Sequence, residues 1–160
     1  MRRRMAMGVM AGSAAGAVRD QFLGVWRLVS CERKLADGSM AHPYGKTPVG
    51  RLTYDKAGRM SAQLMTPGRR STVAPGMNMV SAKASAEEIR EAVGGYAAYF
   101  GTFDVDERER VVIHHVEAAL TPSWVGTDLR RAYRFAGKRL SLTAALPGLT
   151  TELIWAREAD

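Results

Sequence analysis

Two adjacent histidines, His114 and His115, are the residues in this sequence best suited to acid–base chemistry. An imidazole titrates near neutral pH, so it can transfer a proton or bind a metal ion. Both lie in an alternating segment typical of a β-strand, where neighbouring side chains point to opposite faces. Only one of them can therefore enter the interior, which disfavours a two-histidine metal site. Alternation alone does not choose between them, and a hydrogen-bonded structural role competes with ligand binding or proton transfer.

Arg131 is the second candidate, because it shares a strand face with the apolar residues Leu129 and Tyr133. An inward guanidinium could bind a ligand carboxylate or enolate with two hydrogen bonds. Alternatively, Arg130 and Arg131 lie on opposite faces of the sheet and the inner one pairs with an acid such as Glu117. The sequence leaves both interpretations open.

Several other polar side chains could contribute to a small-molecule site. Arg51 and Gln63 are weaker candidates of the same kind as Arg131. Tyrosine hydroxyls can donate hydrogen bonds from an aromatic wall, and the candidates for this role are Tyr44, Tyr54, Tyr96 and Tyr99. If the protein is an enzyme, the catalytic candidates are His115, Arg131 and Tyr99.

The sequence lacks the usual motifs for cofactor and metal chemistry. It has no phosphate-binding glycine-rich loop and no dinucleotide fingerprint. Cys31 is the only cysteine, which excludes an intrachain disulfide and a cysteine-rich zinc site. His42 is isolated from the other two histidines. We therefore expect neither a cofactor nor a metal ion.

Composition and charge indicate one globular domain. The chain has 160 residues, of which 46% are hydrophobic, and a net charge of +7. Three of the positive charges lie together at Arg2, Arg3 and Arg4, and the others alternate with acids, so we expect no nucleic-acid binding. No sufficiently long apolar run is present for membrane insertion.

Residues 1–20 are predicted to be a flexible or signal-like leader before a domain over residues 21–160. The basic triplet precedes a run of Met, Ala, Gly and Ser, which is weakly apolar for a signal peptide. We expect a cytoplasmic protein. The alternative is export, with residues 1–17 as the signal.

The remaining chain breaks into short alternating segments bounded by turn residues, which predicts an all-β domain of about eight strands. In the first segment, alternation places Trp26 and Leu28 on one face and Cys31 on the other. One short helix is expected after Ser85, which has capping-box spacing to Glu88. The expected strands cover residues 24–34, 49–54, 59–65, 96–105, 110–120, 124–135, 139–144 and 150–157. Their short connections favour antiparallel neighbours, and closure into an up-and-down barrel would leave no exposed edge.

An ordered series of motifs resembles the lipocalin-like domain family, within the wider calycin group. Gly24-Val25-Trp26 lies on the first strand, where lipocalins carry their Gly-x-Trp signature, and Arg157 on the last strand resembles the arginine that packs over that tryptophan. The resemblance covers residues 22–157, and its other segments are 43–54, 58–61, 99–102, 115–117, 124–127 and 130–131. It implies a barrel with a ligand cavity, structural roles for Gly24, Trp26 and Arg157, and His115 as the inward histidine.

These observations lead to three functional hypotheses. The first is a barrel that binds a small hydrophobic molecule in its interior, with Tyr44, Arg51, Tyr54, Gln63, Tyr99, His115 and Arg131 as candidate ligand contacts. The second is a cofactor-free isomerase or cyclase that acts on a polyketide- or terpenoid-like substrate in the same cavity. The third is a structural or interaction protein whose barrel is filled by side chains.

Overall fold

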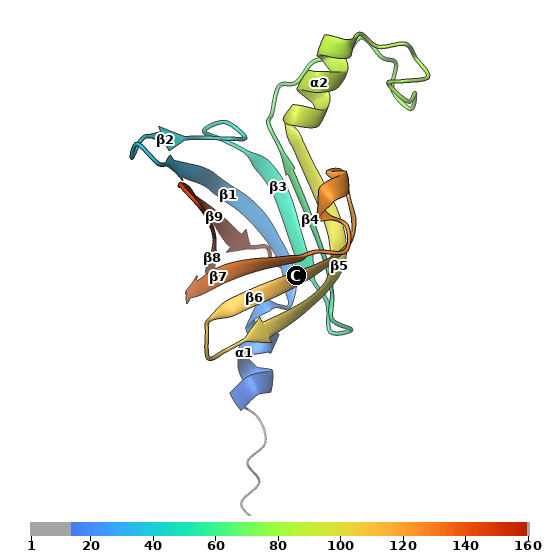
Figure 1. Cartoon of the computed structure of the whole chain (residues 1–160). Coiled ribbons are helices and arrows are strands. Elements are labelled where there is room, and N and C mark those ends of the chain that lie inside the picture. Colours follow the sequence, from blue (N-terminus) through green and yellow to red (C-terminus); the bar gives the residue numbers. More distant parts are fainter. Residues whose placement is uncertain (1–13, 160) are drawn as a thin grey trace, which may run out of the picture.

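The structure, a computed structural model, describes residues 14–159 and consists mainly of β-strands (Figure 1). Two helices, α1 (Ala14–Phe22) and α2 (Ala86–Gly94), and a 3-10 turn, η1 (Pro122–Trp124), accompany the strands. The strands are β1 (Gly24–Leu35), β2 (Met40–Ala41), β3 (Val49–Tyr54), β4 (Arg59–Met65), β5 (Tyr96–Asp106), β6 (Val111–Ala119), β7 (Asp128–Ala136), β8 (Arg139–Leu146) and β9 (Leu149–Arg157).

Eight of these strands form a closed antiparallel barrel. From β3 to β9, each strand pairs with the next along the chain, and β1 pairs with both β3 and β9, which closes the ring. The two-residue strand β2 is an addition at the far end of β1. The fold expected from the alternating segments is therefore confirmed.

A β-bulge in β1 changes which of its residues face inward. The pairing with β9 shifts between Leu28 and Ser30, so one extra residue enters β1 there. Trp26, Leu28 and Cys31 are consequently all buried. The expectation that Cys31 lies on the face opposite Trp26 was wrong, because strict alternation does not continue across a bulge.

One N-terminal segment and one loop also differ from the sequence-based expectation. Part of the segment assigned to a leader forms α1, while residues 1–13, with the basic triplet, lie outside the described residues. The strand expected from residue 124 begins only at Asp128, since Trp124 ends η1 and Gly126 has a positive φ.

Neither α1 nor α2 could span a bilayer, since each has nine residues, about half of the required length.

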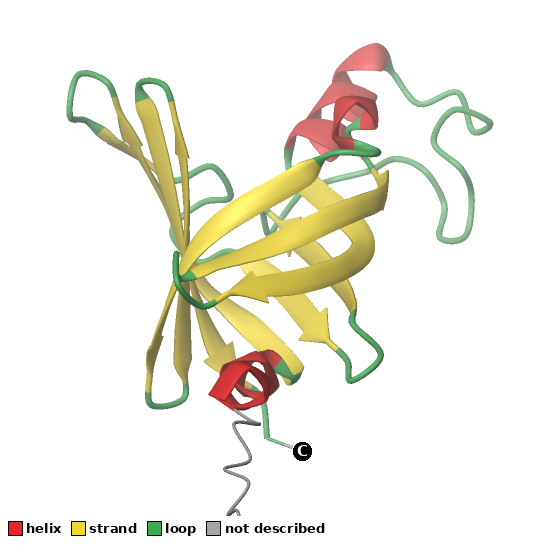
Figure 2. Cartoon of the chain, turned by 60° about the horizontal axis from the view of Figure 1, so that its bottom comes forward, coloured by secondary structure: helices red, strands yellow, loops and turns green. Residues whose placement is uncertain are grey.

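Phe22, the last residue of α1, seals one end of the barrel. Its side chain is fully buried, and its ring makes edge-on contacts with Tyr54, Tyr133 and Phe135, with centroids 4.9–5.4 Å apart. Such packing is favourable for aromatic rings. Figure 2 shows α1 across this end, whereas α2 and its preceding loop extend from the other end. The interior is therefore closed on the α1 side.

Arg157 fastens α1 to the barrel. Its guanidinium lies 4.1 Å from the centroid of the Trp26 ring and donates hydrogen bonds to the carbonyl oxygens of Gln21 and Leu23. The Trp26 indole donates to the Phe22 carbonyl at 2.7 Å. Gly24 has a φ of +116°, and an added Cβ would lie only 3.1 Å from the guanidinium. Glycine at this position therefore allows the turn from α1 into β1 beneath Arg157.

This arrangement predicts that Arg157→Gln lowers the free energy of unfolding by about 2 kcal/mol, because the cation–π contact and both carbonyl hydrogen bonds are lost. Urea denaturation measures the change. The matched control is Arg134→Gln on the exposed face of β7, which should change stability by less than about 0.5 kcal/mol. Equal effects of the two substitutions would contradict the role assigned to Arg157.

Candidate functional site

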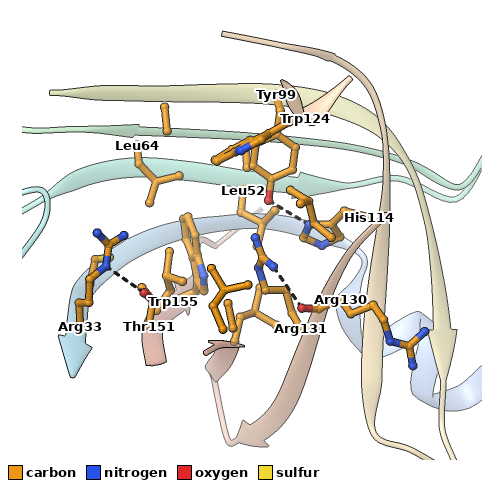
Figure 3. A pocket seen from close by; sticks show the side chains of 18 of the residues that line it. Arg33, Leu52, Leu64, Tyr99, His114, Trp124, Arg130, Arg131, Thr151 and Trp155 are labelled. Carbon is orange, nitrogen blue, oxygen red and sulfur yellow. Dashed lines mark hydrogen bonds between the residues drawn. The ribbon is translucent and has the colours of Figure 1, made fainter. Parts of the chain in front are cut away.

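A cavity of about 470 Å³ occupies the half of the barrel that faces away from α1 (Figure 3). Its walls are mainly apolar side chains that alternate inward along β3, β4, β5, β8 and β9. These are Leu52, Ala62, Leu64, Ala97, Leu142, Leu153 and Trp155. Trp124, from η1, covers one side and packs edge-on against Tyr99 with ring centroids 5.6 Å apart. The cavity is large enough for a small-molecule ligand.

Three buried side chains form a hydrogen-bonded chain at the floor of the cavity. His114 on β6 bonds through Nε2 to the Tyr54 hydroxyl at 2.7 Å and through Nδ1 to the Tyr99 hydroxyl at 2.9 Å. Tyr54 also contacts Phe22, so it joins this chain to the sealed end. Tyr99 and His114 line the cavity. Figure 3 shows the Tyr99 hydroxyl directed at the His114 ring.

Burial keeps all three groups in their neutral forms. Burial, together with the nearby positive charge of Arg131, lowers the pKa of His114 from 6.5 to about 3. Burial also raises the pKa of both tyrosines, although the charge of Arg131 opposes part of the rise at Tyr99. At neutral pH the imidazole therefore has one N–H donor and one acceptor nitrogen.

The positions of the protons follow from the partners available to Tyr54. The Tyr54 hydroxyl is buried, and His114 Nε2 is its only hydrogen-bond partner among the described residues. A buried hydroxyl proton without an acceptor is costly, so we assign the Tyr54 hydroxyl as donor to Nε2. His114 then has its proton on Nδ1 and donates it to the Tyr99 oxygen. The Tyr99 proton is left free, on a residue that lines the cavity.

Three arginines line the cavity, and two of them, Arg131 and Arg33, direct their positive charge toward it, whereas Arg130 extends away (Figure 3). Arg131 on β7 donates one hydrogen bond, at 3.1 Å, to the carbonyl of Arg130. Arg33 on β1 donates to the Thr151 hydroxyl at 3.1 Å. Neither arginine forms an ion pair within residues 14–159. Figure 3 shows the guanidinium of Arg131 extending toward Tyr99.

His115, the histidine favoured as inward by the resemblance, lies on the outer face. Its Nδ1 is 2.7 Å from Asp128 and its Nε2 is 3.0 Å from Asp104, so it links β5, β6 and β7. The hydrogen bond with Asp128 is the main cause of its raised pKa. His114 points inward instead, since it is opposite the buried Phe103 in the β5–β6 pairing. The inward placement expected for His115 is corrected accordingly.

The other candidate residues divide between the two faces of the barrel. Tyr44, Tyr99 and Arg131 line the cavity, and Tyr54 lies beneath it. Arg51 and Gln63 are cross-strand neighbours on the outside, where Arg51 faces Glu158 at 3.8 Å, and Tyr96 borders the same outer hollow. Arg51, Gln63 and Tyr96 therefore do not line the cavity. Within the described part of the chain, no cluster of three metal-ligating side chains occurs.

Sequence reasoning missed several cavity residues. Trp155 lies in the strand expected over residues 150–157 but was not among the candidate residues. Its indole N–H is buried without a hydrogen-bond partner in the described structure. Arg33 enters the wall because the bulge shifts the second half of β1. Trp124 could have been found as an aromatic residue two positions after Pro122, at a position where a loop can fold over the barrel.

The lowered pKa of His114 predicts a loss of stability in acid. The unfolded chain binds a proton near pH 6.5, whereas the folded chain does so only near pH 3, so the contribution of His114 is full above pH 6.5 and is lost as the pH falls toward 3. Urea denaturation at several pH values should show that the free energy of unfolding falls more steeply with decreasing pH for the wild type than for His114→Gln. The difference in slope should correspond to the uptake of up to about one proton on unfolding. Parallel curves would contradict this prediction.

Comparisons with known proteins identify the family of this chain. The model of the lipocalin-like domain family matches residues 23–157. The 4'-hydroxy-3'-methoxypropiophenone carrier protein ppsC of Aspergillus oryzae is 35% identical over 94 residues, which are 55% of this chain and 81% of that protein. A lipocalin-like protein from Bacteroides uniformis has 14% identity and a TM-score of 0.45, and the alignment covers 86% of this chain and 98% of that one. As-p18, an extracellular fatty acid binding protein, has 16% identity and a TM-score of 0.42, and the alignment covers 87% of this chain and 97% of that one. The chain belongs to the lipocalin-like domain family.

Proposed function

We propose that this protein binds a small, mostly apolar molecule inside the barrel. The observation that carries the proposal is the cavity of about 470 Å³ with leucine, alanine and tryptophan walls. Ligand sites are usually concave and apolar with a few polar groups that orient the ligand. The size of the cavity also argues against the third hypothesis, a barrel filled by its own side chains.

The named relative supports an aromatic ligand. Its name describes it as a carrier of 4'-hydroxy-3'-methoxypropiophenone, an aromatic ketone. A molecule of this class could place its ring between the apolar walls and the indoles of Trp124 and Trp155. Its ketone oxygen could accept a hydrogen bond from Tyr99. We therefore favour an aromatic or fused-ring ligand with at least one oxygen acceptor.

A second candidate is a cofactor-free isomerase or cyclase that acts on a polyketide- or terpenoid-like substrate. It is favoured by the free proton of Tyr99 beside Arg131, because two such donors would polarise a carbonyl. Enolisation would also require a base. Among the described cavity residues, His114 has a pKa of about 3, Asp128 bonds to His115, and burial raises the pKa of Cys31 to about 11. These groups are poor bases at neutral pH, so binding is the better-supported function.

The binding proposal predicts that the neutral fluorescent probe N-phenyl-1-naphthylamine binds in the cavity. Ala97→Phe should weaken its binding by roughly tenfold, because the new ring occupies space now bordered by the small Ala97 side chain. The matched control is Ala98→Phe, at the next position of β5 on the opposite face. Fluorescence titration measures both. Equal affinities of the two variants would place the probe outside the barrel.

The catalytic alternative has its own test. In D₂O, an enzyme that enolises a bound ketone would exchange the α-protons of 4'-hydroxy-3'-methoxypropiophenone, which proton NMR detects. We expect no exchange above the buffer rate, because the described cavity lacks an effective base. Exchange that is abolished by Tyr99→Phe, in a variant that still binds N-phenyl-1-naphthylamine, would establish catalysis instead.

A further inference from the structure

The polar groups that face the cavity are almost all hydrogen-bond donors. A guanidinium has five N–H donors and no acceptor. Among the described residues, Arg131 donates to the Arg130 carbonyl and also lies close enough to Tyr99 to lower the pKa of that hydroxyl, which leaves further donors for a ligand. The proton assignment leaves the Tyr99 hydroxyl with a free proton. Since the His114 Nδ1–H donates to the Tyr99 oxygen, the chain at the floor ends in a donor. An occupant of the cavity must therefore supply acceptors.

The charges around the cavity are also unbalanced. Of the three arginines that line the cavity, Arg33 and Arg131 direct positive charge toward it, whereas Arg130 is exposed and extends away (Figure 3). Asp128 is the one acidic side chain among the lining residues. The Asp128 carboxylate is occupied on the outer face by His115 at 2.7 Å. A charge held in apolar surroundings without a partner is costly. The cavity is therefore electrostatically complementary to an anion.

The positions of Arg131 and Arg33 indicate which of the two an anion in the cavity would contact. Arg131 is half-buried and its guanidinium extends toward the Tyr99 hydroxyl, beside His114 (Figure 3). Arg33 lies across the cavity, where its Nε is already bound to Thr151. The planar fork of a guanidinium matches the two oxygens of a carboxylate. The Arg131 and Tyr99 pair is thus the better-prepared anion site.

We propose that the ligand has a carboxylate group, which binds to the Arg131 guanidinium and the Tyr99 hydroxyl at the floor of the cavity. Its apolar body extends along Leu64, Ala97 and Trp155 toward the end of the barrel away from α1. The Tyr54–His114 pair sets the direction of the Tyr99 proton, so these two residues position the donor. This inference rests on the proposed function, because it specifies the ligand of the same cavity.

A pair of ligands of nearly equal shape separates charge recognition from general binding. 1-Naphthaleneacetate has a carboxylate, and 1-naphthaleneacetamide has a neutral amide in its place. Displacement of N-phenyl-1-naphthylamine measures both affinities at neutral pH. We expect wild-type protein to bind the acid roughly tenfold more tightly than the amide, because the amide cannot form the charged fork. Equal affinities, or an acid that fails to displace the probe, would overturn the proposal.

Substitutions then locate the carboxylate. Arg131→Gln should remove the preference, because it should weaken binding of the acid roughly tenfold more than binding of the amide or the probe. Tyr99→Phe should weaken the acid by a smaller factor. Arg134→Gln, on the same strand but exposed, should retain the full preference. Retained probe binding demonstrates that each variant has folded.

Two outcomes would contradict the assignment while leaving the proposed function intact. If Arg131→Gln weakens the acid and the amide equally, Arg131 shapes the cavity but does not recognise charge. If Arg33→Gln removes the preference and Arg131→Gln does not, the carboxylate binds at Arg33 and not at Arg131. Failure of wild-type protein to bind N-phenyl-1-naphthylamine would instead overturn the proposed function itself.

Discussion

The sealed end of the barrel is the constraint on which the rest of the structure depends. Arg157 lies over the Trp26 ring and bonds to the carbonyls that end α1, and this holds Phe22 among the aromatic rings inside the barrel. An eight-stranded barrel has limited interior volume. Because the aromatic residues fill the α1 side, the empty space is confined to the other half. Binding can then occur from one side only, against a fixed floor.

That floor is polar, and its polarity has a defined direction. Tyr54 lies between the aromatic plug and His114, and because it is fully enclosed it must donate its proton to the imidazole. The direction of the hydrogen bond from His114 to Tyr99 is then fixed as well, and the Tyr99 hydroxyl keeps a proton that it can donate into the cavity. Hydrogen bonds in a low-dielectric interior are stronger and more cooperative than in water. The packing at one end of the barrel thereby sets the chemistry presented at the other.

The sequence was sufficient to predict the barrel, because alternation and turn residues are local signals. Seven of the expected strand segments match β-strands closely, and the helix after Ser85 is capped as its spacing indicated. α1 was missed because it follows a low-complexity run of small residues, and its role depends on a distant residue, Arg157. β2 has two residues, too few for any periodic pattern.

The site was harder to predict than the fold. Choosing between His114 and His115 requires the register of β5 against β6, which alternation within one strand does not contain. Arg33 required knowledge of the bulge in β1. Arg131 was identified from its residue type and strand face and Tyr99 from its residue type alone, and both line the same cavity. Residue types alone could not predict the donor–acceptor direction of the hydrogen bonds through His114, because that direction depends on which tyrosine hydroxyl is fully buried.

The energetic cost of the cavity bears on its purpose. Apolar walls around an empty space lose dispersion contacts, and a half-buried guanidinium without a carboxylate partner loses solvation. A barrel selected for stability alone would fill the space and replace Arg131 with an apolar side chain, as replacement of buried ions in other proteins often stabilises them. An occupant with a flat apolar body and an acidic end would satisfy the walls and the arginine together. Both costs are thus explained by one ligand, whereas a purely structural role would leave each of them without compensation.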